Sequence, residues 1–373
     1  DMVTSSVYDM NEEHVRLVVK DILGKWRNRS DDYRYNALFT THVGGGKAST
    51  PMAMMYYDEF QRQNKQLERP LKIAITFSQD TSNSDNMLTT NKSLNRAMAD
   101  YSKLFGGTYN DQNVAEYTEN VVSRLDRKIK NDTRYLDLVI VVDQLLTGFD
   151  APQLNTLYVD RTLKGASLIQ AYSRINRIDD MVHKPFGRIV NYRWPAHTEK
   201  IMNDALALYA DKNSANLQTE LIDDPDGDSE VLAKDFDTLV TETRDVVGDL
   251  SDLTNGFHDS PLGEHDQDKM YSLLRKYNGN INKLKQDDQY DYGDPDALLT
   301  QIGMDKESEV MLTGTLTNEL KEHIAKTRKL DIRDLTLEMT HVHDVSVNYD
   351  YLSELIAKLA DQVHDNLTDK IAQ

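Results

Sequence analysis

The sequence predicts an α/β domain with a parallel sheet over residues 1–195 and an all-α domain over residues 196–373. Three observations support this division. The first half alternates short apolar runs with helical periodicity, which is typical of strands joined by crossover helices. After Trp194 and Pro195 the apolar residues recur every three or four positions, with almost no strand-like runs. A chain of 373 residues is also longer than one hydrophobic core usually serves.

Five apolar segments of the first half are predicted to be strands. They cover residues 36–41, 71–77, 137–142, 156–160 and 187–192. The third segment is the most continuous apolar run in the chain, as expected of a central strand that is buried on both faces. Helices are predicted between the strands, over residues 53–63, 91–105, 116–129 and 167–175. This alternation places the strands in one parallel sheet.

The second half is predicted to be helical, beginning with apolar residues Ile201, Ala205 and Leu208. Its last segment carries one apolar stripe at steps of three and four, formed by Leu352, Ile356, Leu359, Val363, Leu367 and Ile371. Core packing is the ordinary use of such a stripe, and docking onto a partner is the alternative. The acidic segments 223–228 and 287–296 are predicted to be loops or helix connections.

Charge separates the two halves more sharply than hydropathy does. Residues 1–194 carry 26 Lys and Arg against 24 Asp and Glu, whereas residues 195–373 carry 17 against 38. A near-neutral half can bind a nucleotide or touch phosphates through a few placed arginines. The acidic half repels a polyanion, so we expect it to face protein, solvent or basic partners, although simple solubility explains the charge equally well.

Composition excludes several classes of protein. The chain has a mean hydropathy of -0.62 and no apolar run of the roughly 20 residues that a membrane helix needs. Acidic residues throughout the first 25 positions argue against a signal peptide. The chain has 0 cysteines, which excludes disulfides and thiolate sites and is compatible with a reducing compartment. We therefore expect a cytoplasmic protein and, because the sequence begins with Asp1, a fragment of a longer one.

Three motif-like segments fail on spacing. Residues 42–50 include three glycines and Lys47, but a phosphate loop needs a glycine where Thr41 stands and a hydroxyl where Ala48 stands. Residues 222–233 lack the first and the twelfth ligand of a calcium loop, which favours a solvated acidic loop. His341 and His343 alternate as metal ligands on a strand would, yet no third ligand is indicated. No metal site is predicted.

The strongest signal is a polar segment that directly follows the predicted central strand, residues 145–152, with the sequence LLTGFDAP. The carboxyl end of a parallel strand is where α/β sheets bind ligands. Gly148 permits close backbone approach, and the hydroxyl of Thr147 can donate to a phosphate oxygen. Asp150 completes this segment as a candidate functional residue.

A second signal, QAYSRINR at residues 170–177, follows twenty residues later. In a helix, Gln170, Arg174 and Arg177 project from one face because they are separated by four and three residues. Guanidinium groups carry permanent charge and match phosphate oxygens, so this face suits a triphosphate. An amphipathic helix with solvated arginines is the bland alternative, and it would be preferred if this segment stood alone.

Taken together, residues 138–177 resemble motifs V and VI of superfamily 2 helicases, in the form found in the motor (restriction, R) subunit of type I restriction-modification enzymes. Residues 36–43 with 56–60 resemble that family's motif IV strand and following helix, and residues 187–192 its closing strand. The resemblance covers most of residues 30–195. The acidic half is similar only in kind, since these subunits end in a helical region.

The resemblance implies a RecA-like fold, the second of two motor domains that hold ATP and magnesium between them, with the Walker loop on the first. It places Arg174 and Arg177 near the γ-phosphate, one of them as an arginine finger, with Gln170, Gly148 and Asp150 at the nucleotide. Thr147 would contact DNA. Thr41, at the end of the motif IV strand, would lie near a DNA phosphate, although a hydroxyl that caps the strand is an equal alternative.

The resemblance also implies the parent protein's activity: ATP-dependent translocation on double-stranded DNA and DNA cleavage, in a complex with methyltransferase (M) and specificity (S) subunits. The fragment alone is expected to do neither, and its helical half is expected to dock the motor onto that complex. Two alternatives stay open. One is another superfamily 2 translocase that shares motifs V and VI, and the other is a non-catalytic acidic helical adaptor with a degenerate RecA-like fold.

Overall fold

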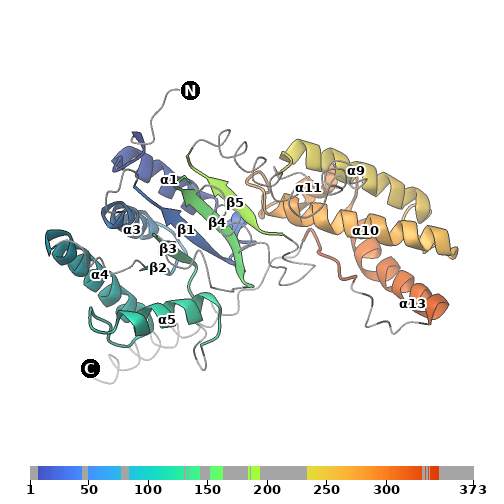
Figure 1. The fold of residues 1–373 in the computed structure, drawn as a ribbon. Helices are drawn as coiled ribbons and strands as arrows, with labels where there is room; N and C mark the ends of the chain where they lie inside the picture. Colours follow the sequence, from blue (N-terminus) through green and yellow to red (C-terminus); the bar gives the residue numbers. More distant parts are fainter. Residues whose placement is uncertain are drawn as a thin grey trace, which may run out of the picture.

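The fold is described from a computed structural model (Figure 1). It describes residues 7–43, 49–76, 84–129, 132, 134–142, 152–162, 184, 186–193, 233–329, 332, 335 and 337–343, without the side chains of 84–91. The predicted helix 167–175, the apolar stripe at 352–371, the acidic segment 223–228 and the predicted boundary at 195 lie outside these ranges. We call the described residues 7–193 the sheet unit and 233–343 the helical unit.

A five-stranded sheet forms the centre of the sheet unit, in the order β2-β3-β1-β4-β5. Its strands are β1 (Asn36–Thr41), β2 (Ile73–Thr76), β3 (Leu138–Val141), β4 (Leu154–Asp160) and β5 (Arg188–Asn191). Every neighbouring pair is parallel, so the α/β prediction is confirmed. All residues of β1 to β4 are buried, as their apolar sequences predict, whereas β5 at the edge is half-buried.

Helices flank this sheet and complete its core. They are α1 (Glu12–Gly24), α2 (Trp26–Arg29), α3 (Thr50–Asn64), α4 (Ser84–Phe105) and α5 (Val114–Leu125). Helix α1 packs against α3, and α3 in turn packs against β2 and β3. The predicted helix 116–129 ends earlier, at Leu125, because the chain turns into a left-handed conformation at Arg127, where φ is 53°.

Helix α1 was not among the predicted elements, although its sequence has strong helix signals. The side chain of Asn11 caps the helix by accepting a hydrogen bond from the backbone N–H of His14. Acidic residues occupy the first turn, where they complement the helix dipole. The buried positions follow the spacing of an amphipathic helix: Val15, Val18, Val19, Ile22 and Leu23.

The described elements of the helical unit are α9 (Phe236–Leu253), α10 (Glu264–Lys285), α11 (Pro295–Gln301), α12 (Lys306–Val310), the π-helix η2 (Met311–Leu316) and α13 (Thr317–Arg328). Helix α10 packs against both α9 and α13 (Figure 1). These helices share a hydrophobic core that is separate from the core under the sheet. The acidic segment 287–296, predicted to be a connection, links α10 to α11. Within the described ranges, none of the helices is long and apolar enough to cross a membrane.

Candidate functional site at the carboxyl edge of the sheet

The five parallel strands bring their carboxyl ends to one edge of the sheet. In the register of β1 with β4, Thr41 lies beside Asp160, and Thr40 of β1 lies beside Val141 at the end of β3. Ligands of open α/β sheets bind outside this edge. Because β3 ends just before residue 143, the edge is also where the chain enters the segment that carries Thr147 to Asp150.

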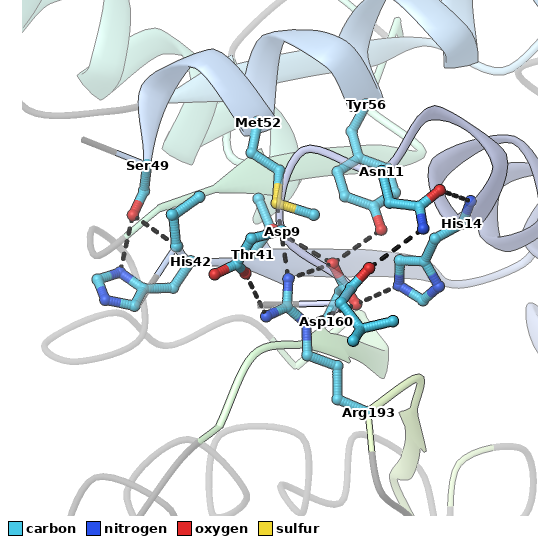
Figure 2. Close-up of polar contacts among 12 residues, drawn as sticks. Asp9, Asn11, His14, Thr41, His42, Ser49, Met52, Tyr56, Asp160 and Arg193 are labelled. Carbon is cyan, nitrogen blue, oxygen red and sulfur yellow. Dashed lines mark hydrogen bonds and ion pairs between the residues drawn. The ribbon is translucent and has the colours of Figure 1, made fainter. Parts of the chain in front are cut away.

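Asp160 is the centre of a polar cluster at this edge (Figure 2). Its side chain is fully buried and accepts hydrogen bonds on both oxygens. His14 Nε2 lies 2.8 Å from Oδ1, and the Tyr56 hydroxyl donates to Oδ2 at 2.8 Å. The hydroxyl of Thr41 donates to Oδ2 at 3.4 Å. We call these residues, together with Arg193, the Asp160 cluster.

Arg193 balances the charge of the cluster. Its Nε and Nη2 donate to the two oxygens of Asp160 at 3.0 and 3.1 Å, and its Nη1 donates to Asp9 at 2.8 Å. Its Nη2 also donates to the sulfur of Met52 at 3.6 Å. One buried cation therefore bridges two carboxylates from distant parts of the chain.

The contacts of Asp160 determine the direction in which its own pKa and that of Tyr56 are shifted. Burial alone would raise the pKa of Asp160, but hydrogen bonds from His14 and Arg193 outweigh burial and hold this pKa below its ordinary value. Burial, together with the negative charge of Asp160, raises the pKa of Tyr56 well above its ordinary value. The carboxylate is therefore ionised and the phenol neutral at physiological pH, so Tyr56 donates a hydrogen bond to Asp160 and keeps its proton.

The cluster joins elements that are far apart in sequence: the start of α1, the ends of β1 and β4, the middle of α3 and the residues after β5. Both carboxylate oxygens of Asp160 accept hydrogen bonds from protein donors, two on Oδ1 and three on Oδ2. The cluster is thus a structural clamp that fixes the shape of the carboxyl edge. Sequence reasoning missed it, although a buried strand that ends in a carboxylate was a usable signal.

Two further contacts hold segments at the same edge. Ser49 Oγ lies 2.8 Å from His42 Nδ1 and accepts the backbone N–H of Val43 at 3.0 Å, which closes the two ends of the glycine-rich segment 44–48. Arg161 Nη1 donates to the carbonyl oxygen of Val142 at 2.6 Å. This second bond ties Val142, the last described residue before segment 143–151, to the residue that follows β4.

The predicted site residues divide into two groups. Thr41 is described: it is fully buried, and its hydroxyl donates to Asp160, which favours the alternative that it caps the strand. The other predicted site residues, Thr147, Gly148, Asp150, Gln170, Arg174 and Arg177, lie outside the described residues. Their roles, and a DNA contact for Thr41, stay predictions.

The two histidines that were weighed as metal ligands, His341 and His343, lie in the helical unit and have protein partners. His341 Nδ1 lies 2.8 Å from the hydroxyl of Thr313, and His343 Nε2 lies 2.9 Å from Asp296. Among the residues that the structure describes, no group of three or more His, Cys, Asp or Glu side chains could hold a metal ion.

Family models match both units of the chain. Residues 33–194 match the model of type I restriction enzyme subunit R domain 3, and residues 231–373 match that of the C terminal part of subunit R of type I restriction and modification enzymes. The chain belongs to the R subunit family of type I restriction enzymes. The family that the resemblance to motifs V and VI indicated is therefore confirmed for this R-subunit chain.

Curated relatives agree with this membership. A type I restriction enzyme endonuclease subunit of Staphylococcus aureus (strain COL) is 28% identical over 97% of this chain. One from Staphylococcus saprophyticus is 28% identical over 98% of the chain. The HindI endonuclease subunit of Haemophilus influenzae is 45% identical over 62 residues, which are 17% of the chain and 6% of that protein. The R-subunit chain spans only 36% of the length of the two staphylococcal relatives.

Proposed function

We propose that this chain provides the second RecA-like motor domain of a DNA translocase that ATP drives, within the R subunit of a type I restriction enzyme. The observation that carries the proposal is the parallel sheet, whose β3 ends at the carboxyl edge directly before the segment with Thr147, Gly148 and Asp150. The match to subunit R domain 3 supports it.

In this proposal Arg174 and Arg177 supply positive charge to the γ-phosphate, and Gln170 assists them. The two arginines described at the carboxyl edge do not take this role. Arg193 is held by Asp160 and Asp9, and Arg161 donates to the backbone at Val142. The described edge alone therefore does not fit ATP, and we assign the magnesium ligands and most of the nucleotide contacts to a first motor domain elsewhere in the subunit.

The whole subunit, in this proposal, translocates on double-stranded DNA and cleaves it, in a complex with M and S subunits. Residues 196–373 form the part that docks onto the complex. The helical unit contacts the sheet unit on the amino side of the strands, through β4 residue Asn155, and so leaves the carboxyl edge available to the first motor domain. Loss of complex assembly after removal of 196–373 is the expected result, and unchanged assembly would contradict this docking role.

The test of the motor role uses the complete R subunit assembled with its M and S subunits. We expect Arg174→Ala or Arg177→Ala to lower DNA-dependent ATP hydrolysis by about 10³-fold for whichever arginine is the finger. Arg62→Ala is the matched control, because Arg62 forms an exposed ion pair with Glu59 on α3. Hydrolysis rates in both motif VI variants that equal the control would refute the motor role and favour a non-catalytic module.

A further inference from the structure

The helical unit is fastened to the sheet unit by polar groups of the loop that follows α10. Asn28 of α2 uses its side-chain amide to donate to two backbone carbonyls of this loop, Asp287 at 2.6 Å and Tyr290 at 2.8 Å. These bonds join residues about 260 positions apart in the chain, as their separations of 259 and 262 show. Because both bonds end on backbone carbonyls, they fix the backbone conformation of the loop as well as its position against α2.

Arg29 makes a bidentate ion pair between the two units. Its Nε and Nη2 donate to the two carboxylate oxygens of Asp288 at 3.1 and 3.0 Å, which is the bidentate geometry that makes arginine pairs strong and directional. Its Nη1 donates to Asp21 of α1 at 2.8 Å. Lys25 Nζ also bridges Asp288 and Asp21, at 2.9 and 3.0 Å. The Arg29 side chain is only 7% exposed, so water competes little for these bonds.

Strand β4 contributes a buried contact next to this pair. Asn155 donates to the side-chain oxygen of Gln286 at 3.0 Å and to the backbone oxygen of Arg29 at 3.1 Å. Both Asn155 and Gln286 are fully buried. We call the contacts of Lys25, Asn28, Arg29 and Asn155 with residues 286–290 the Arg29–Asp288 interface. Figure 1 shows the helical unit beside β4 and β5, where this interface lies.

Helix α1 connects this interface to the Asp160 cluster. His14 in its first turn contacts Asp160 at the carboxyl edge, whereas Asp21 near its end and Lys25, which caps it, contact Arg29 and Asp288. The helix has 13 residues and is therefore about 20 Å long. One rigid element thus contacts a buried carboxylate at the carboxyl edge and takes part in partly exposed ion pairs at the helical unit.

We propose that the Arg29–Asp288 interface makes the helical unit move with the sheet unit as one rigid body, and that α1 carries displacement of the carboxyl edge to the helical region. Arg29 is a positioning residue in this arrangement. Interfaces between domains usually allow relative motion unless they are large and apolar, so a small interface needs directional polar bonds to be rigid. That nucleotide turnover supplies the displacement rests on the proposed function; the rigid attachment itself does not.

Single-molecule energy transfer in the 373-residue chain tests the attachment. The sequence has 0 cysteines, so Glu119→Cys on α5 and Ser272→Cys on α10, both exposed, accept a dye pair without other changes. We expect one narrow distribution in the parent chain. Asp288→Lys places a cation against Arg29 and Lys25. We expect the fraction of molecules whose dye-to-dye distance lies outside the parent distribution to rise roughly ten-fold, equivalent to about 1.4 kcal/mol. Asp294→Lys, an exposed position of the same loop, is the charge-matched control.

Two results would overturn the attachment. One is a distribution in Asp288→Lys that equals that of Asp294→Lys. The other is an unchanged distribution in Asn28→Ala, which removes the two amide bonds without adding a charge and carries the test if Asp288→Lys does not fold. Circular dichroism of each variant establishes folding before the comparison.

The consequence for the motor is measured in the complete R subunit. We expect Asp288→Lys to keep DNA-dependent ATP hydrolysis while the number of base pairs moved per ATP falls, because the edge still turns over nucleotide but its movement no longer reaches the helical region. An unchanged ratio would overturn the transmission role of α1. Failure of the motor role itself would appear separately, as normal hydrolysis in Arg174→Ala and Arg177→Ala, and would leave the energy-transfer result standing.

Discussion

Arg193 and Asp160 form an ion pair with two hydrogen bonds, of 3.0 and 3.1 Å, between the residues that follow β5 and the end of β4. The two side chains are 3% and 0% exposed. Removing one partner of such a buried pair destabilises the fold, because the charge of the other partner stays away from water and loses its compensation. The carboxyl edge of the sheet therefore depends on both partners being present.

Replacement of Asp160 should destabilise the sheet unit strongly. We expect Asp160→Asn to lower the free energy of unfolding by about 3 kcal/mol, because Arg193 stays buried with Asp9 as its remaining carboxylate partner and loses its bidentate pair. Urea unfolding at pH 7 measures the change. Glu13→Gln, which removes an exposed ion pair with Arg16 on α1, should have no measurable effect. Equal unfolding midpoints for the two variants would show that the cluster contributes little.

The same carboxylate should make stability depend on pH in one direction. The pKa of Asp160 is lowered in the folded chain, so its contribution is present above the ordinary value of 3.8 and is lost as pH falls through the lowered pKa. The gap in unfolding free energy between the parent chain and Asp160→Asn should therefore stay nearly constant from pH 7 to about 5 and shrink below about 4. A gap that widens on acidification would contradict this assignment.

Thr41 offers a test between its two predicted roles. Thr41→Val keeps the shape of the side chain but removes the hydroxyl that donates to Asp160 at 3.4 Å. If the hydroxyl serves the Asp160 cluster, stability should fall by about 1 kcal/mol and the DNA affinity of the complete subunit should stay unchanged. Binding titrations at several salt concentrations measure the affinity. A weaker affinity with unchanged stability would restore the DNA-contact role.

The two hydrophobic cores should respond separately to cavities. Leu274 of α10 and Leu38 of β1 are both buried, each in a different core. We expect Leu274→Ala to cost about 3 kcal/mol and to speed hydrogen exchange in α9 to α13, with little change in β1 to β4. Leu38→Ala should give the reverse pattern. Faster exchange across both units in either variant would show that they unfold together.

Most of the sheet could be predicted from the sequence because its signals are local. Residues 138–142 are apolar throughout and contain β3, and segment 36–41 forms β1 with the predicted bounds. Helix α1 has equally local signals, a capping asparagine and apolar positions at helical spacing, so it too could have been predicted from the sequence. The sheet order, by contrast, depends on pairings that no short segment encodes.

The polar contacts could not be predicted in this way. His14 and Asp160 are separated by 146 residues, and Arg29 and Asp288 by 259. A single charged residue in a sequence carries no sign of the partner that the fold brings to it. The motif residues such as Arg174 were found because their spacing within one short segment of sequence is local, which is also why their partners stay unassigned.

Arg161 gives a prediction that connects the described edge to the motif V segment. Its Nη1 donates to the carbonyl of Val142, one residue before segment 143–151. Displacement of reacting groups by about 1 Å can cost up to 10²-fold in rate, so in the complete R subunit Arg161→Met should lower kcat for DNA-dependent ATP hydrolysis by roughly ten-fold or more. The KM for ATP should change much less, since Arg161 positions the segment through the backbone.

Arg134→Met is the matched control for Arg161→Met. Arg134 Nη1 also donates to a backbone carbonyl, that of Leu104 at 2.9 Å, but it lies before β3 and not at the carboxyl edge. Arg134→Met also removes an ion pair with Asp132, so it should cost at least as much stability as Arg161→Met, and destabilisation alone would lower kcat in both variants. A kcat that falls equally in both variants would mean that the effect is general destabilisation. Turnover would then not depend on the hydrogen bond from Arg161 to Val142.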